Sequence, residues 1–116
     1  MLVRVITDNH IRGGEELKLD VESSVENALR RYGAQITRVE IHLADENSKK
    51  NGGQDKKCTA EAHVAGLQAV SATAHGDNIA QAVGGALDKL VAQLEHKLGR
   101  LSDRKGRGSM GQEPGE

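Results

Sequence analysis

Histidine is the residue type in this chain that most plainly could do chemistry. The chain has five histidines, and imidazole is a common ligand of protein-bound metals. His42, His63 and His75 share the polar side of alternating stretches, which suggests a metal site on one face of a sheet. Plain hairpins would instead place Glu61 opposite His42 and Glu40 opposite His63. They would also separate His63 from His75 by roughly 20 Å, so we predict no metal and no other cofactor.

Catalytic motifs are the second candidate, and they give no support for an enzyme. The glycine pairs at 13–14, 52–53 and 84–85 lack the neighbouring residues of a phosphate-binding loop. The sequence has neither zinc-ligand spacing nor a nucleophile elbow. The one cysteine, Cys58, lies on the apolar side of an alternating stretch, so we expect a buried small hydrophobe and no internal disulfide. We therefore predict that the protein is not an enzyme.

A long amphipathic stretch from Asn78 to about Leu101 carries the third candidate, a set of charged side chains. Its apolar residues recur at steps of three and four, as in a helix that packs on a core. They are Ile79, Val83, Ala86, Leu87, Leu90, Leu94, Leu98 and Leu101. Asp77 is the expected N-cap. The glycines at 84–85 predict close packing of the helix backbone on a sheet.

Charge divides the polar side of this helix into two edges. The basic edge and its flank consist of Lys89, Gln93, His96, Lys97 and Arg100. Asp88 and Glu95 form the acidic edge. Two interpretations stay open. One is a solvated surface of mixed charge, which is the ordinary outcome, and the other is a local basic surface for an anionic partner.

Composition limits the possible classes of function. The chain has 116 residues, of which 36% are hydrophobic and 28% charged, as is typical of one globular domain. Its net charge of -1 means that a nucleic-acid surface would have to be a local patch. With one Tyr and no Phe or Trp, a sheet that stacks RNA bases on aromatic rings is nearly excluded. No stretch is apolar enough to span a membrane, and we expect a cytoplasmic protein.

Hydrophobic periodicity predicts six elements in the order β-α-β-β-β-α. The expected strands are 2–7, 36–46, 57–64 and 68–75, and the expected helices are 15–32 and 78–101. A crossover would make the first two strands parallel, and hairpins would add the other two. The predicted fold class is α+β, a two-layer sandwich whose four-stranded sheet has both helices on one face. Residues 1–101 would form the domain, and residues 102–116 a disordered tail.

Three segments of the second half resemble a known family. They are AEAHVAG at 60–66, AVSATAHGD at 69–77 and IAQAVGGALDKLVAQL at 79–94. Together with ITRVEIHL at 36–43, they resemble the ribosome hibernation-promoting factor and ribosome-associated inhibitor family. Its members are also called sigma-54 modulation or ribosomal subunit interface proteins. The resemblance covers roughly residues 1 to 100.

This resemblance implies a βαβββα fold and a function without catalysis. Proteins of the family bind the small ribosomal subunit in stationary phase or stress. They occupy the channel for messenger and transfer RNA and so block translation. The contacts are mainly to ribosomal RNA phosphates, through Lys and Arg side chains on the helices. The chain is similar to the short members, which lack the further C-terminal domain of the long ones.

The resemblance also implies which residues bind RNA. The candidates are Lys89, His96, Lys97 and Arg100 on the final helix and Lys18, Arg30 and Arg31 on the first. Lys89, Lys97 and Arg100 match basic positions of the family, whereas His96 stands where lysine is usual, so its charge depends on pH. One alternative stays open. A divergent member could act as a protein-interaction module, through the acidic first helix and the open sheet face, without ribosome binding.

Overall fold

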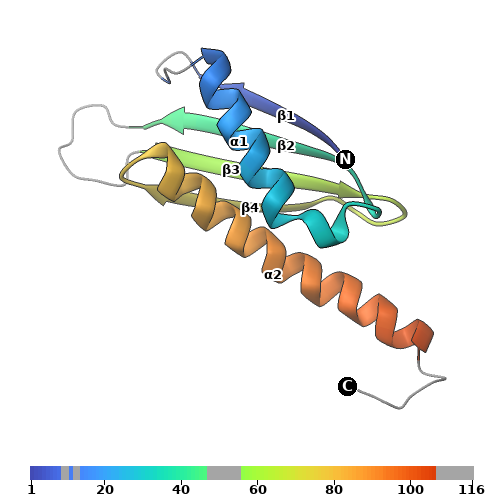
Figure 1. The fold of residues 1–116 in the computed structure, drawn as a ribbon. Coiled ribbons are helices and arrows are strands. Elements are labelled where there is room, and N and C mark those ends of the chain that lie inside the picture. The colour runs from blue at the N-terminus through green and yellow to red at the C-terminus, as the bar shows by residue number, and fades with distance from the viewer. Residues whose placement is uncertain (9–10, 12–13, 47–55, 107–116) are drawn as a thin grey trace.

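The computed structural model describes residues 1–8, 11, 14–46 and 56–106, with their side chains as far as Leu98. Its elements follow the predicted order β-α-β-β-β-α (Figure 1). They are β1 (Leu2–Thr7), α1 (Gly14–Ala28), a 3₁₀ helix η1 (Arg30–Tyr32), β2 (Ile36–Asp45), β3 (Lys56–Val64), β4 (Val70–Gly76) and α2 (Ile79–Gly106). The predicted α+β fold class is confirmed.

The strands form one mixed sheet in the order β1-β2-β3-β4. β1 lies parallel to β2, with Val3 opposite Val39, and the two following pairs are antiparallel. The connection between β3 and β4 turns at Gly66, whose φ of 80° is a left-handed conformation that glycine adopts without strain. Both helices cover the same face of the sheet, as predicted (Figure 1).

The core lies between the sheet and the two helices. Alternate residues of the strands point toward the helices, and burial repeats with a period of two along β3. The helices contribute the predicted apolar stripes, in which Val25, Leu90 and Leu94 have 0% exposure. The opposite face of the sheet carries polar, partly exposed side chains, as expected for a sheet with one solvated side.

The first helix ends earlier than the sequence predicts. α1 stops at Ala28, and the chain continues as η1. In this 3₁₀ helix the N–H groups of Tyr32 and Gly33 donate to carbonyl groups three residues earlier. Arg30 and Arg31 therefore project from a separate turn, and not from the last turn of α1.

The second helix begins at a different cap from the predicted one. Asn78 is the N-cap, because its Oδ1 accepts a hydrogen bond from the Gln81 N–H at 2.8 Å. Gln81 Oε1 in turn accepts from the Asp77 N–H at 2.8 Å. This reciprocal arrangement is close to a capping box, so the prediction of Asp77 as the cap is wrong by one residue.

The same helix is longer than predicted. α2 continues to Gly106, beyond the expected end at Leu101. The segment 102–105 contains no glycine or proline that would stop it. The remainder of the predicted tail, 107–116, lies outside the described residues.

The pairing of β2 with β3 differs by two residues from a symmetric hairpin. Glu40 lies opposite Glu61, and His63 lies opposite Arg38. The predicted pairs of Glu61 with His42 and of Glu40 with His63 are therefore wrong. A shift of two residues keeps every side chain on its face of the sheet, so the predicted core is unaffected.

Candidate nucleic-acid interface

α2 lies over β4, an edge strand of the sheet, and one row of its side chains follows that strand. Lys89 Nζ donates to the Thr73 carbonyl oxygen at 3.0 Å. One turn later, Gln93 Nε2 donates to the Ser71 carbonyl oxygen at 2.7 Å. These bonds use backbone acceptors on an edge of the sheet that no further strand covers among the described residues. Lys89 therefore has a structural role as well as a positive charge.

η1 lies beside the C-terminal half of α2, next to the acidic edge of that helix. Arg31 Nη2 is 3.2 Å from Glu95 Oε2, and the Arg31 guanidinium lies 5.3 Å from the centroid of the Tyr32 ring. Arg30 Nη2 donates to Asn27 Oδ1 at 2.7 Å. All these polar side chains are exposed, so the contacts hold the two arginines only weakly.

Four residues of the predicted RNA-binding set lie on η1 and on one turn of α2. Arg31 contacts Glu95 on α2. The next two residues of that helix, His96 and Lys97, are exposed but point in other directions around the helix axis. We call Arg30, Arg31, His96 and Lys97 the η1–α2 cluster. Arg100 follows His96 by one helical turn along α2, and its side chain lies outside the described residues.

The two other predicted residues lie apart from this cluster. Lys89 lies about two turns before Lys97 along α2, against β4. Lys18 is partly buried in the N-terminal half of α1, at the far end of that helix from η1. The seven predicted residues therefore do not form one continuous patch in the described part of the chain.

Ion pairs cover the open face of the sheet, on the side opposite the helices. Glu40 carboxylate oxygens lie 3.2 Å from Arg38 Nε, 3.6 Å from His42 Nε2 and 3.7 Å from Arg4 Nη1. Sequence reasoning did not select Arg4 or Arg38. Arg38 could have been selected from the sequence, because it lies on the same face of its strand as His42. Selecting Arg4 also required the order of the strands, which places it beside Glu40.

One group on this face has the composition of a metal site. Ligand atoms of Glu40, Glu61 and His63 lie within 4.8 Å of one another. Sequence reasoning missed the group because it paired the two strands in another register. Arg38 Nη2 lies 3.2 Å from His63 Nε2, and Arg38 also pairs with Glu40, so a permanent cation already stands among these ligands. We interpret the group as an ion-pair network.

The other two histidines of the metal hypothesis lie elsewhere on the sheet. His42 is opposite Thr59, and His75 is opposite Lys57. Since Lys57 and His63 are six residues apart on one strand, His63 and His75 are separated by roughly 20 Å at ~3.3 Å per residue. The separation that the sequence predicted for this pair is confirmed.

Cys58 is a core residue. Its side chain has 0% exposure, and burial raises the pKa of the thiol from 9.0 to about 12. The reactive form of cysteine is the thiolate. The prediction of a buried small hydrophobe is therefore confirmed, and the thiol is placed for packing.

Comparison with known proteins gives this arrangement a family. The sequence profile described as Sigma 54 modulation protein / S30EA ribosomal protein matches residues 5–102. The chain belongs to this family. The match extends from β1 into α2 and so includes both helices and nearly the whole sheet. The family resemblance seen in the sequence is confirmed.

Solved structures share the fold of this S30EA family member. A ribosomal subunit interface protein from Coxiella burnetii is 18% identical, with a TM-score of 0.62, and the match covers 85% of this chain and 99% of that one. The N-terminal domain of Protein Y from Thermus thermophilus is 16% identical, with a TM-score of 0.63, and the match covers 83% and 98%. No curated protein matches the chain.

Among the described residues, no helix is both long and apolar enough to cross a membrane.

Proposed function

We propose that this S30EA family protein is a non-enzymatic regulator that binds the small ribosomal subunit and blocks translation in stationary phase or stress. The family match over residues 5–102 is the observation that carries the proposal. It begins within β1 and ends within α2, so a ribosome-binding unit of residues 1–101 is the natural assignment. The block is steric, without catalysis or a cofactor, and it acts in the cytoplasm.

The surface proposed for ribosomal RNA phosphates is the η1–α2 cluster, extended along α2 to Arg100. Lys97 is exposed and needs no rearrangement to meet a phosphate. Arg31 would exchange the Glu95 carboxylate for a phosphate, and an exposed ion pair of this kind contributes only about 0–1 kcal/mol. Lys89 and Lys18 would make separate contacts on either side of this surface.

The acidic residues beside the cluster limit its affinity. Glu95 lies next to Arg31, and Asp88 is on the same edge of α2 two turns earlier. Both carboxylates repel phosphate. We expect ribosome binding that depends steeply on salt, because the four residues of the η1–α2 cluster are solvent-exposed.

Binding of single-residue variants to isolated small subunits tests this surface. Lys97→Glu should weaken binding and lower the slope of log K against log salt by about 0.7–0.9 for each phosphate that the side chain no longer neutralises. Lys57→Glu is the matched control, since it makes the same change of charge on the opposite face of the protein. Equal weakening by both variants would show that the effect is one of net charge, and unchanged binding of Lys97→Glu would show that the surface is wrong.

A second candidate function is that of a protein-interaction module. The observation that favours it is an acidic first helix, with Glu15 and Glu16 in its first turn and no basic residue in its last turn. Such a surface repels RNA and attracts basic protein segments. The two functions use different sides of the helical layer and can exist together.

A further inference from the structure

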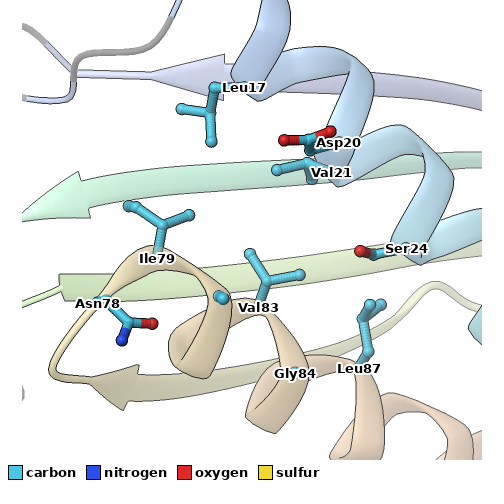
Figure 2. A pocket seen from close by; sticks show the side chains of 10 residues that line it. Leu17, Asp20, Val21, Ser24, Asn78, Ile79, Val83, Gly84 and Leu87 are labelled. Atoms are coloured by element: carbon cyan, nitrogen blue, oxygen red, sulfur yellow. The ribbon is translucent and has the colours of Figure 1, made fainter.

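A cavity opens between the two helices on their outer side (Figure 2). Its volume is about 550 Å³, which is within the range of sites that accept small ligands or several side chains. Leu17 and Val21 reach into it from α1, and Ile79, Val83 and Leu87 reach into it from α2 (Figure 2). The floor is therefore aliphatic, although it lies at the surface of the helical layer.

Gly84 keeps this cavity open on the α2 side. A Cβ atom added at Gly84 would have nothing within 4 Å, so close packing does not explain this glycine. Gly85 differs, because a Cβ there would lie 3.0 Å from the Ala74 Cβ atom. The prediction that both glycines allow close packing on the sheet thus holds for Gly85 and is wrong for Gly84. A glycine inside a helix costs about 1 kcal/mol of stability relative to Ala. At Gly84 no close packing within the described chain offsets this cost.

Carboxylates border the cavity. Asp20 is exposed and lines it from α1 (Figure 2). Glu16 precedes Asp20 by one turn of α1, and Asp88 follows Gly84 by one turn of α2, so each adds negative charge on the same side of its helix. The lining residues include no Lys or Arg. An aliphatic floor with an acidic border is complementary to an apolar side chain flanked by basic residues.

This charge pattern excludes two other occupants. Phosphates of a nucleic acid would meet the carboxylates and be repelled. A second copy of the chain, docked symmetrically, would place Asp20 and Asp88 against the same carboxylates of its partner. A basic segment of a different protein meets neither obstacle.

We propose that this cavity is a docking site for a segment of another protein, which inserts bulky aliphatic side chains over Gly84 and places Lys or Arg beside Asp20 and Asp88. The site does not depend on the proposed ribosome-binding surface, because none of its lining residues belongs to the η1–α2 cluster. It gives the helical layer two functional regions of opposite charge.

Binding of a defined peptide tests the site. The probe is a fluorescein-labelled peptide, GSKKLLKKSG, and its two controls replace the four Lys with Glu or the two Leu with Ser. Anisotropy gives the affinity for the whole protein, and NMR shifts of the Ile79 and Leu87 methyl groups report where the peptide binds. Peptide binding with shifts at these methyl groups, abolished in both control peptides, is the expected result.

Protein variants separate this site from general attraction. Gly84→Leu fills the cavity and should weaken binding by about tenfold or more, whereas Ala92→Leu adds the same side chain at an exposed position of α2 outside the cavity. Asp20→Lys should weaken binding several-fold more than Glu26→Lys, an equal change of charge on α1 away from the lining. Far-UV circular dichroism checks that each variant is folded. Equal affinity of the wild-type protein and all variants for the peptide, or no binding of the peptide to any of these proteins, would overturn the proposal.

Discussion

Lys89 Nζ donates a hydrogen bond to the Thr73 carbonyl oxygen at 3.0 Å. This bond joins the middle of α2 to the outer edge of β4, and the neighbouring bond from Gln93 to Ser71 does the same one turn later. Unpaired acceptors on an edge strand would otherwise be open to pairing with another chain. Lys89, which the sequence analysis selects as a basic RNA-binding residue, thus also holds the helical layer on the sheet.

Replacement of Lys89 should therefore lower stability. Lys89→Met keeps the aliphatic stem and removes the donor, and we expect a loss of about 0.5–1.5 kcal/mol in the free energy of unfolding. Lys97→Met is the control, because Lys97 is exposed further along the same helix. Urea unfolding measures both. Equal effects of the two substitutions would show that the bond to Thr73 contributes nothing.

Gly76 should tolerate no side chain. A Cβ atom there would lie 2.6 Å from the Gln81 Cβ atom and 2.7 Å from the Ala82 backbone nitrogen. The first turn of α2 would have to move away from the end of β4, so Gly76→Ala should cost about 1–3 kcal/mol. Thermal unfolding followed by circular dichroism gives the size of the loss. An unchanged melting temperature would mean that the helix is not packed directly on this strand end.

Gly84→Ala should have the opposite effect. The position is exposed and lies inside α2, and a new methyl group meets no atom within 4 Å. Alanine should therefore stabilise the protein by about 0.5–1 kcal/mol through its better helix propensity. The same unfolding experiment measures this gain. A loss of stability would show that the backbone at Gly84 is closer to its surroundings than the structure indicates.

Stability at alkaline pH should depend on Cys58. Burial raises the pKa of its thiol from 9.0 to about 12, so above pH 9 the unfolded chain releases this proton while the native protein keeps it. The contribution of the thiol to stability is complete below pH 9 and falls as the pH rises toward 12, by up to about 1.4 kcal/mol per pH unit. Urea unfolding between about pH 8 and 10.5 measures the slope.

Cys58→Ala is the control for that slope, because every other titrating group is retained. The difference in unfolding free energy between the two proteins should shrink as the pH rises above 9. Parallel curves over the whole range would contradict a buried, protonated thiol.

The fold could be predicted because the periodicity of each element was clear. Alternation marked β3, and apolar steps of three and four marked α2. The register of β2 with β3 could not be predicted, because it depends on which residues pair on the two sides of the long connection 46–55. In the structure these residues are Asp45 and Lys56. The error left the core intact, since a shift of two residues does not exchange the faces of a strand.

The candidate site could be predicted only in part. Its residue types followed from the family resemblance, but their neighbours depend on tertiary packing. The position of α2 over β4 gave Lys89 a backbone partner, and the 3₁₀ turn carried Arg31 to Glu95. Contacts between residues so far apart in the sequence leave no local pattern. The cavity beside Gly84 could not be predicted from the sequence for the same reason.

Binding to the small ribosomal subunit can be measured by co-sedimentation of the wild-type protein with purified subunits over a series of salt concentrations. We expect pelleting with the small subunit at low salt and a steep loss of pelleting as salt rises, because exposed cations such as Lys97 would contact phosphates. Absence of pelleting even at the lowest salt, or pelleting that salt does not change, would contradict this expectation.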